Sequence, residues 1–183
     1  VTRMRIVAGK AAALWMATAV AVVLSGCAGR SAPPPPALPG AGTADVHADP
    51  SGEMAHLAAV RLEGQDGYDR LVLEFTDRVP GYTIGYQPLP AREDASGLDI
   101  PLPGATTVLN LSLNPATAAG WGGGPPTYSG PRTLTADTGS VTEVKSAGDF
   151  EAVLTWVAGL RTQEPFRVQA LEGPPRLIVD IAH

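Results

Sequence analysis

The sequence has a single cysteine, few aromatic residues and almost no lysine. Cys27 is the one thiol among 183 residues, so the chain forms no internal disulfide and its stability has to come from packing. Aromatic residues make up 5% of the chain, which limits the large side chains available to a core. Residues 56–183 contain fifteen acidic side chains against nine lysines and arginines, a net charge of −6. An acidic domain of this kind argues against nucleic acid as a partner.

The sequence also lacks an apolar run long enough to span a membrane. The longest run, residues 11–24, is fourteen residues, which gives about 21 Å of helix against a hydrocarbon core of about 30 Å. Arg3, Arg5 and Lys10 precede this run, and no acidic residue accompanies them. A basic start, a short apolar segment and small residues after it are typical of a secretory signal peptide. We therefore predict a signal peptide over residues 1–26.

The residues that follow the apolar run resemble a lipidation signal. Leu24-Ser25-Gly26-Cys27 is similar to the lipobox of bacterial lipoproteins. The resemblance implies cleavage before Cys27 and lipid on that cysteine, with acyl chains such as palmitate. The alternative is an ordinary signal peptide with an incidental cysteine, but the one cysteine of the chain stands at the matching position. Because two acyl chains make a durable anchor, we expect the protein on the outer face of the cytoplasmic membrane, held there through Cys27.

Residues 27–55 are predicted to be a flexible linker. The segment holds four consecutive prolines at positions 33–36 and turn-forming residues at 49–52, with almost nothing apolar to bury. Proline runs favour an extended polyproline helix, and the glycine and serine portions behave as coil. The linker would hold a domain of residues 56–183 clear of the membrane and within reach of the cell wall. His47 lies in this segment and is predicted to have no function.

Apolar residues alternate with polar ones along the rest of the chain. Alternation with period two predicts strands with one buried face. Four segments show it clearly and four more weakly: residues 70–76, 109–114, 166–170 and 176–182, then 58–62, 81–86, 98–102 and 141–145. Clusters of turn-forming residues separate these segments. Many short strands at this spacing predict an all-β domain, either a small sandwich or a barrel.

One segment, residues 150–160, fits two periods. Phe150, Leu154 and Val157 lie on one face of a helix, whereas every second residue from Phe150 to Ala158 fits a strand equally well. Periodicity alone leaves helix and strand open.

Several motifs resemble the AMIN-like domain of actinobacterial lipoproteins. They are Gly67-Tyr68-Asp69-Arg70 with Leu71-Val72-Leu73-Glu74-Phe75, Val79-Pro80-Gly81-Tyr82, Gly148-Asp149-Phe150-Glu151, Pro165-Phe166-Arg167-Val168 and the closing Pro174-Pro175-Arg176-Leu177-Ile178-Val179-Asp180-Ile181. The closing motif is similar to the end of AMIN domains more widely. The resemblance covers residues 57–183 and implies a small β-sandwich, which favours strand for residues 150–160. It also implies a targeting module, since AMIN domains place amidases and secretin partners in the cell envelope and some bind peptidoglycan.

No catalytic motif stands out. The sequence contains no nucleophile elbow, zinc-protease helix, paired-cysteine motif or phosphate loop. The loop carboxylates are scattered over predicted turns, where solvated acids are the usual explanation: Asp66, Asp69, Glu93, Asp94 and Asp99. His56 and His183 stand at the domain ends, and we expect them exposed rather than paired on a metal, because a third ligand is missing. We therefore predict no enzyme activity, no metal and no cofactor.

The candidate ligand-binding residues are Trp121, Tyr128, Asp69, Arg70 and Arg176. Trp121 and Tyr128 lie in or next to a long loop, residues 114–131, where Trp121 is either a lid over the sandwich end or a platform for sugar rings or a protein partner. The charged residues serve either ion pairs at strand ends or recognition of peptide carboxylates and sugar hydroxyls. We predict a non-catalytic binding or targeting module for peptidoglycan or an envelope protein. The alternative is a lipid or small-molecule carrier, which requires an apolar cavity between the sheets.

Overall fold

In the computed structural model the chain divides into two units, Val1–Pro33 and Pro34–His183. The structure describes residues 1, 38–50 and 52–183. Almost all of the predicted signal peptide, the predicted lipidation site Cys27 and the first part of the predicted linker lie outside the described residues. Within the described part of the chain, no helix has the length and apolarity needed to cross a membrane.

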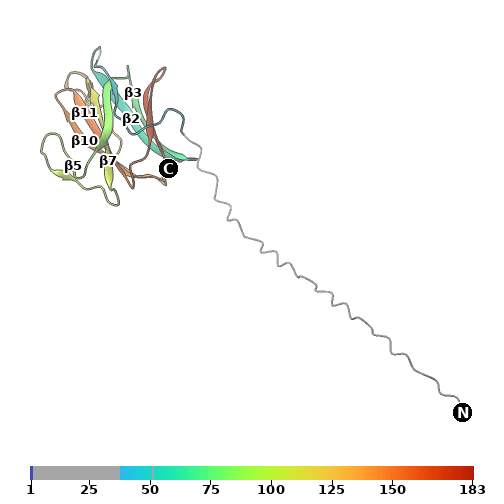
Figure 1. Ribbon diagram of the computed structural model, residues 1–183. Coiled ribbons are helices and arrows are strands. Elements are labelled where there is room, and N and C mark those ends of the chain that lie inside the picture. Colours follow the sequence, from blue (N-terminus) through green and yellow to red (C-terminus); the bar gives the residue numbers. More distant parts are fainter. Residues whose placement is uncertain (2–37, 51) are drawn as a thin grey trace. The chain divides into compact units, whose positions relative to one another are not determined.

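Two sheets packed face to face form the sandwich (Figure 1). The six-stranded sheet has the order β1-β4-β7-β11-β10-β9, with strands Val46–Ala48, Gly81–Gln87, Thr107–Asn114, Val153–Leu160, Val141–Phe150 and Thr133–Leu134. The five-stranded sheet has the order β12-β13-β3-β2-β8, with strands Phe166–Glu172, Pro175–Ala182, Tyr68–Phe75, Ala55–Gln65 and Ala116–Thr117. Neighbouring strands are antiparallel, except that β2 and β8 run parallel.

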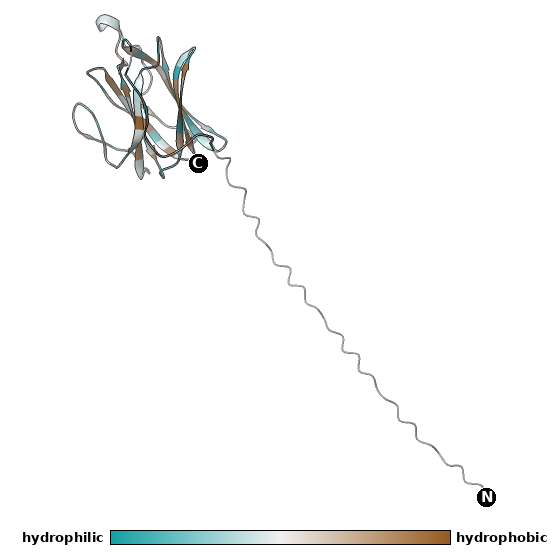
Figure 2. Cartoon of the chain, turned by 45° about the horizontal axis from the view of Figure 1, so that its top comes forward, coloured by the Kyte–Doolittle hydropathy of each residue, from teal (hydrophilic) through white to brown (hydrophobic). Residues whose placement is uncertain are grey.

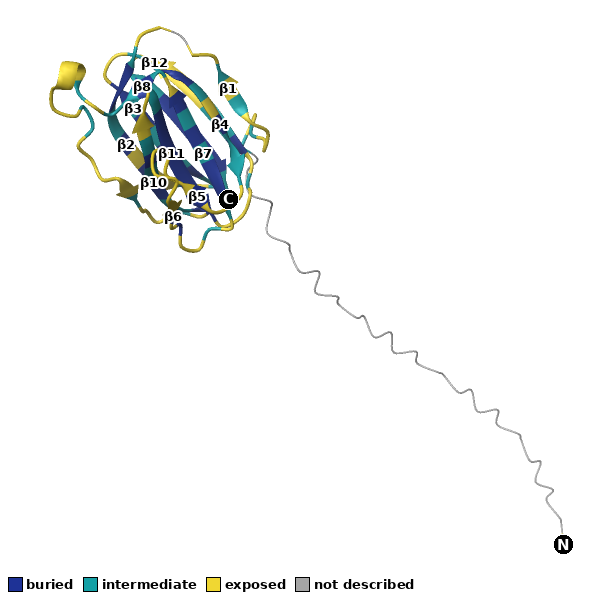
Figure 3. Ribbon diagram, turned by 90° about the vertical axis from the view of Figure 1, so that its left-hand side faces the viewer, coloured by how far each residue is buried: buried dark blue, intermediate teal, exposed yellow. Residues whose placement is uncertain are grey.

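The core between the sheets is built by the alternation of apolar and polar residues. In β7, Leu109, Leu111 and Leu113 are fully buried, and the residues between them face outward. Trp156 of β11 and Phe166 of β12 are the largest fully buried side chains. Hydropathy and burial both follow this pattern, with buried residues along the strands and exposed ones in the loops (Figures 2 and 3). Burying one leucine contributes roughly 1.5–3 kcal/mol, so the packing of the two inner faces is the main source of stability.

The predicted all-β sandwich is confirmed, and within residues 150–160 the segment Val153–Leu160 is strand, as the resemblance implied. β10 ends at Phe150 and β11 begins at Val153, with Glu151 and Ala152 as the two-residue turn between them. Both turn residues have positive φ, 48° and 66°, as in a type I′ hairpin turn. Because neither is glycine, each residue costs roughly 1 kcal/mol in this conformation. The strands that the sequence did not predict, β1, β5, β8 and β9, are two or three residues long, too short to show a period.

The N-terminal edge corrects the predicted linker. Val46–Ala48 pairs with β4, and Gly42 exchanges two backbone hydrogen bonds with Phe166 of β12, at 3.0 and 2.8 Å. Residues 42–48, called the strap below, therefore contact an edge of each sheet. The ring of His47 lies 3.0 Å from the Thr83 hydroxyl. A strand this short gives no periodic signal, and it forms because the edge of β4 offers unpaired backbone groups.

The connection between β4 and β7, residues 88–106, folds over the outer face of the six-stranded sheet and is called the arm. It contains a short ladder of β5 (Ala91–Arg92) with β6 (Asp99–Ile100), and this ladder is all that forms of the weakly predicted strand at 98–102. Apolar residues of the arm and the sheet pack in a second, smaller core: Ala91, Ile100, Leu102, Val108, Ala147 and Val157. The arm thus covers one part of the outer face and leaves the part beside it open.

Candidate functional site

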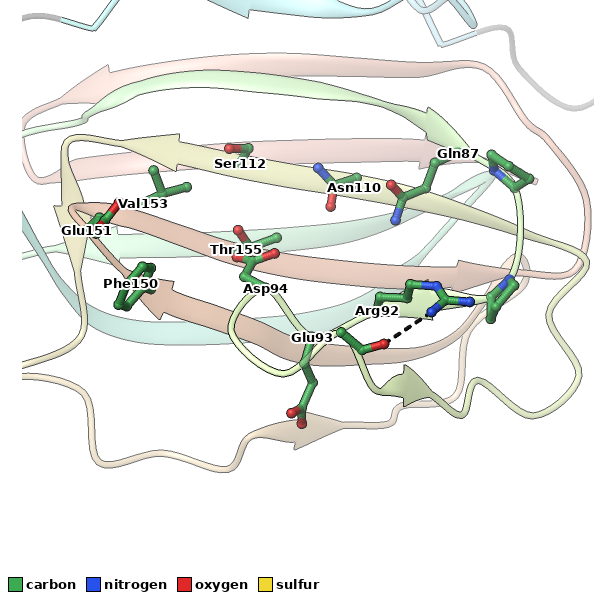
Figure 4. Close-up of a pocket in the computed structure, with 13 residues that line it drawn as sticks. Gln87, Arg92, Glu93, Asp94, Asn110, Ser112, Phe150, Glu151, Val153 and Thr155 are labelled. Atoms are coloured by element: carbon green, nitrogen blue, oxygen red, sulfur yellow. Dashed lines mark hydrogen bonds between the residues drawn. The ribbon is translucent and has the colours of Figure 1, made fainter.

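The open part of the outer face is a groove with a volume of about 800 Å³. Strands β4, β7 and β11 form its floor, the arm forms one wall, and the turn between β10 and β11 closes one end (Figure 4). The volume falls within the range of about 300–1,000 Å³ that is typical of small-molecule sites. The groove is therefore large enough for two or three sugar rings or a short peptide.

Four polar side chains form the floor of the groove: Gln87, Asn110, Ser112 and Thr155. Ser112 stands directly opposite Thr155, and Asn110 is two residues along the same strand, so all three share the outer face. The leucines that alternate with Asn110 and Ser112 hold β7 in the core. None of the four side chains makes a hydrogen bond within the described part of the chain. Their hydroxyl and amide groups are available to a ligand.

An aromatic ring stands at the closed end of the groove. Phe150, the last residue of β10, is 57% exposed, although phenylalanine is usually buried. The turn behind it is supported by β8, because the Ala116 N–H donates to the Ala152 carbonyl at 2.8 Å. A firmly held ring beside free hydroxyl and amide groups can stack on the apolar face of a sugar while those groups bind its hydroxyls.

The arm is fixed to the sheet at Asp94. The Asp94 N–H donates to the Ala147 carbonyl of β10 at 3.0 Å. The Asp94 carboxylate lies over Gly148, where an added Cβ would stand 2.3 Å from the Oδ2 atom. Any larger residue at position 148 would push the carboxylate away. Glycine at this position therefore sets the wall of the groove.

The charges at the groove are mostly negative. Glu93 and Asp94 of the arm and Glu151 of the turn contribute carboxylates, and Arg92 contributes the cation. Arg92 is partly engaged, since it donates to the Gly97 carbonyl at 3.2 Å (Figure 4). This balance disfavours an anionic ligand. Across the described residues, no group of three histidine, cysteine, aspartate or glutamate side chains is placed to hold a metal ion.

The predicted candidates Arg70 and Arg176 lie on the opposite side of the molecule, on the outer face of the five-stranded sheet. Arg70 donates two hydrogen bonds to the fully buried Asp180, at 2.7 and 2.9 Å, and Arg167 donates two more, at 3.1 and 2.9 Å. Burial by itself raises the pKa of Asp180, but the hydrogen bonds from Arg70 and Arg167 outweigh it and hold the pKa below its usual value. Arg176 makes no ion pair within the described residues.

Asp69 is fully buried at the start of β3. Its carboxylate accepts backbone N–H groups from Gly139, Ser140 and Val141, at 3.0, 2.8 and 2.8 Å. Three such bonds hold the chain where it enters β10. This contact joins the two sheets and leaves the carboxylate little capacity for a ligand.

Trp121 and Tyr128 lie at the edge of the sandwich between β8 and β9. Trp121 belongs to the short helical turn Trp121–Gly123; it is 62% exposed and stacks on His56 with the ring centres 3.7 Å apart. His56 was predicted to be exposed, and this prediction is wrong: the side chain is 3% exposed, because Trp121 covers it and Asp77 lies 3.0 Å from its Nδ1 atom. Tyr128 meets Trp156 edge to face, with ring centres 5.7 Å apart.

The five predicted candidates therefore do not converge on one site, and their role in ligand binding stays a prediction. The groove residues Asn110, Ser112 and Thr155 were missed by the sequence reasoning. In the sequence these residues are simply the polar positions of alternating strands. Any strand with one face in solvent shows the same feature, so it does not mark a binding site. Of the scattered carboxylates, the fold brings Glu93 and Asp94 to the groove.

Comparison with known proteins gives one match. The family model of the AMIN-like domain matches residues 55–183. The matched region begins with β2 and ends with β13, and it includes the floor and wall of the groove. No curated protein and no solved structure matches the chain.

Proposed function

The chain belongs to the AMIN-like domain family over residues 55–183, and on that premise we propose that it is a non-catalytic binding module of the cell envelope. The groove is the observation that carries the proposal. It offers amide, hydroxyl and aromatic side chains, which are groups that bind a polar polymer without reacting with it.

The ligand that fits the groove best is the glycan of peptidoglycan. Its sugars carry hydroxyl and acetamido groups, which can both donate and accept hydrogen bonds. Asn110 and Gln87 provide amides, and Ser112 and Thr155 provide hydroxyls, with the matching capacity for both. Phe150 provides the face on which a sugar ring stacks. An uncharged glycan also avoids repulsion by the carboxylates of the arm.

Co-sedimentation with purified peptidoglycan tests this site. We expect Asn110→Ala and Phe150→Ala each to weaken binding about fivefold, the effect of losing roughly 1 kcal/mol of contact. Gln169→Ala, an exposed polar residue on β12 of the other sheet, is the matched control and should bind as wild type does. Binding by hydrogen bonds and stacking should also survive moderate salt, whereas a contact led by arginine would weaken.

Two results would contradict the site. Equal binding by Asn110→Ala, Phe150→Ala and wild type would move the contact away from the groove. Trp121→Ala and Arg176→Ala would then be the next variants, since the sequence predicted both residues as ligand contacts. Absence of sedimentation at every salt concentration would refute wall binding, and an envelope protein would become the better partner.

The proposal includes a membrane anchor at Cys27. Its support is the sequence alone: the basic start, the apolar run and the lipobox-like residues. The family match supports an envelope location and leaves the anchor untested. Anchored in this way, the domain would work on the outer face of the cytoplasmic membrane, close to the wall.

Metabolic labelling with an alkyne fatty acid tests the anchor. Wild type and the control Ser31→Ala should be labelled and found in the membrane fraction. Cys27→Ala should lose the label and leave that fraction for the medium. Unchanged labelling of Cys27→Ala would refute lipidation at this residue.

The carrier alternative depends on an apolar cavity between the sheets. The inner faces are filled by fully buried side chains, among them Leu57, Leu111 and Trp156. This packing favours the binding module over a carrier that encloses its cargo.

A further inference from the structure

A second cavity lies at the edge of the sandwich, away from the groove. The connection between β8 and β9, residues 118–132, covers it and is called the edge loop; its exposed helical turn projects from the body in Figure 3. The cavity has a volume of about 380 Å³, enough for one aromatic ring with a short side chain. Its apolar lining comes from Ala118, Pro126, Tyr128, Leu154 and Trp156.

Trp156 lines this cavity and carries a hydrogen-bond donor that no described residue uses. Its side chain is fully buried, and its indole Nε1 has no hydrogen-bond partner in the described part of the chain. A buried N–H without an acceptor costs free energy, because water solvated it in the unfolded chain. The rest of the core around Trp156 is apolar. A ligand oxygen that accepted a hydrogen bond from Nε1 would therefore remove this cost, whereas an oxygen elsewhere in the core would find no donor.

A cation also lines the cavity. Arg132 lines the cavity, forms no ion pair with the described residues, and has as its one side-chain contact the Ser146 hydroxyl at 3.4 Å. Ser146 pairs directly with Trp156 across β10 and β11. Residues opposite each other in an antiparallel pair carry their side chains on the same face, about 4.5–5.5 Å apart. The Arg132 side chain therefore reaches the residue directly opposite Trp156.

The nearby carboxylate of Asp149 forms no ion pair with Arg132. Asp149 also lines the cavity, but its Oδ2 atom accepts the Ala118 N–H at 2.8 Å and the Thr117 hydroxyl at 3.1 Å. Asp149 thus holds the base of the edge loop. Arg132 is left as the group that can attract a negative charge.

The edge loop is attached in a way that lets it open. Besides the contacts of Asp149, the N–H groups of Thr127 and Tyr128 donate to the Ala118 carbonyl, at 3.0 and 3.3 Å, and Trp121 stacks on His56. At its far end the loop is tied to β10, because the Ser146 N–H donates to the Arg132 carbonyl at 2.9 Å. The contacts to the Ala118 carbonyl lie within the loop itself. Displacing Tyr128, which packs edge to face with Trp156, would expose part of the Trp156 ring without breaking a strand.

We propose that this cavity binds an apolar monocarboxylate. The apolar part packs against Tyr128 and Leu154, and the carboxylate accepts the indole N–H of Trp156 while it pairs with Arg132. This site is separate from the groove, so the inference does not depend on the proposed recognition of glycan.

The test is a titration of the full chain, labelled with ¹⁵N, with 3-phenylpropionate. The chain has three tryptophans, so their indole N–H signals are assigned with Trp121→Phe and Trp15→Phe. We expect a saturable shift of the Trp156 indole N–H signal as 3-phenylpropionate is added. The neutral analogue 3-phenylpropanamide should bind at least tenfold more weakly, because it lacks the charge that Arg132 attracts.

Arg132→Gln separates this site from unspecific binding. The variant removes an exposed side chain, so the fold stays intact, and it should lower the affinity for 3-phenylpropionate at least tenfold. Arg176→Gln, an arginine of the opposite sheet that also lacks an ion pair, should bind as wild type does. An unchanged Trp156 signal, or equal affinity for the acid and the amide, would overturn the proposal.

Discussion

The two outer faces of the sandwich use polar residues in opposite ways. On the five-stranded sheet, most charged side chains are paired: Arg70 and Arg167 share Asp180, and Arg61 pairs with Glu74, whereas Arg176 is the exception. On the six-stranded sheet, the side chains of the groove floor have no partner among the described residues. The same alternating pattern in the sequence produces both faces. What distinguishes them is whether the strand next in the sheet supplies a complementary group.

The difference teaches where stability and binding reside. A face whose charges are paired loses stability when one partner is removed, because the other charge remains without compensation. A face of unpaired hydroxyls and amides loses little stability on substitution, since water solvates these groups in both states. Substitutions on the two faces should therefore separate folding from ligand binding.

The largest effect is expected at the paired face. Asp180→Asn should lower the free energy of unfolding by about 2–3 kcal/mol at neutral pH, because it leaves two arginines facing an uncharged buried amide. Glu74→Gln, which breaks the more exposed pair with Arg61, is the control and should cost less than about 1 kcal/mol. Urea unfolding measures both. Equal losses would mean that burial of Asp180 does not set its contribution.

The pH dependence of the same variant sharpens this prediction. The folded pKa of Asp180 lies below its usual value, so its contribution is present above the unfolded pKa of about 3.9 and is lost as pH falls through the folded pKa. The gap in stability between wild type and Asp180→Asn should be constant above about pH 5 and shrink below pH 4. A gap that stays constant into the acid range would show that the carboxylate charge is not what stabilises this face.

The turn at the end of the groove should give the next largest effect, with the opposite sign. Replacing Glu151 by Asn and Ala152 by Gly places residues that tolerate positive φ at both turn positions. We expect the free energy of unfolding to rise by about 1 kcal/mol, measured by urea unfolding. The conservative Asp66→Asn, in the turn before Gly67, should change it little. If the double variant is less stable than wild type, contacts of the Glu151 side chain stabilise the turn by more than its positive φ angles cost.

Trp121→Ala should have a smaller effect on the free energy of unfolding. It distinguishes the two roles predicted for Trp121, a lid over the end of the sandwich or a platform on which a ligand stacks. The stack on His56 predicts a loss of about 1 kcal/mol in the free energy of unfolding, and Trp121→Phe should restore most of it. That outcome would identify Trp121 as a lid. An unaltered melt with lost binding to peptidoglycan would identify it as a stacking platform.

The floor of the groove should give the smallest change in stability. Ser112→Ala and Asn110→Ala should each stay within about 0.5 kcal/mol of wild type, as is usual for partly exposed positions away from special contacts. Both should nevertheless weaken binding to peptidoglycan. A large loss of stability at Ser112 would show that the two outer faces do not differ in the way described.

The fold was predictable to the extent that it depends on alternation of apolar residues. The long strands β3, β7, β12 and β13 show the period, and the core follows from them. The groove was not predictable in this way. It depends on where the arm folds back, which is decided by contacts between residues far apart in sequence, such as Asp94 over Gly148. His56 is a similar case, because a residue 65 positions away covers it.

The strap determines which contacts break first when the N-terminal end of the domain is pulled. If the chain is pulled from an anchor before residue 38 while the groove holds the wall, tension first reaches the hydrogen bond from Arg167 to the Pro39 carbonyl. It then reaches the two hydrogen bonds between Gly42 and Phe166 and the three-residue β1. All of these can yield before any strand of the core is stretched, since β2 begins at Ala55. Releasing residues 42–54 would lengthen the tether by up to roughly 45 Å, at about 3.3–3.6 Å per extended residue. Release of the strap would thus lengthen the tether when the distance between membrane and wall increases, while the sandwich stays folded.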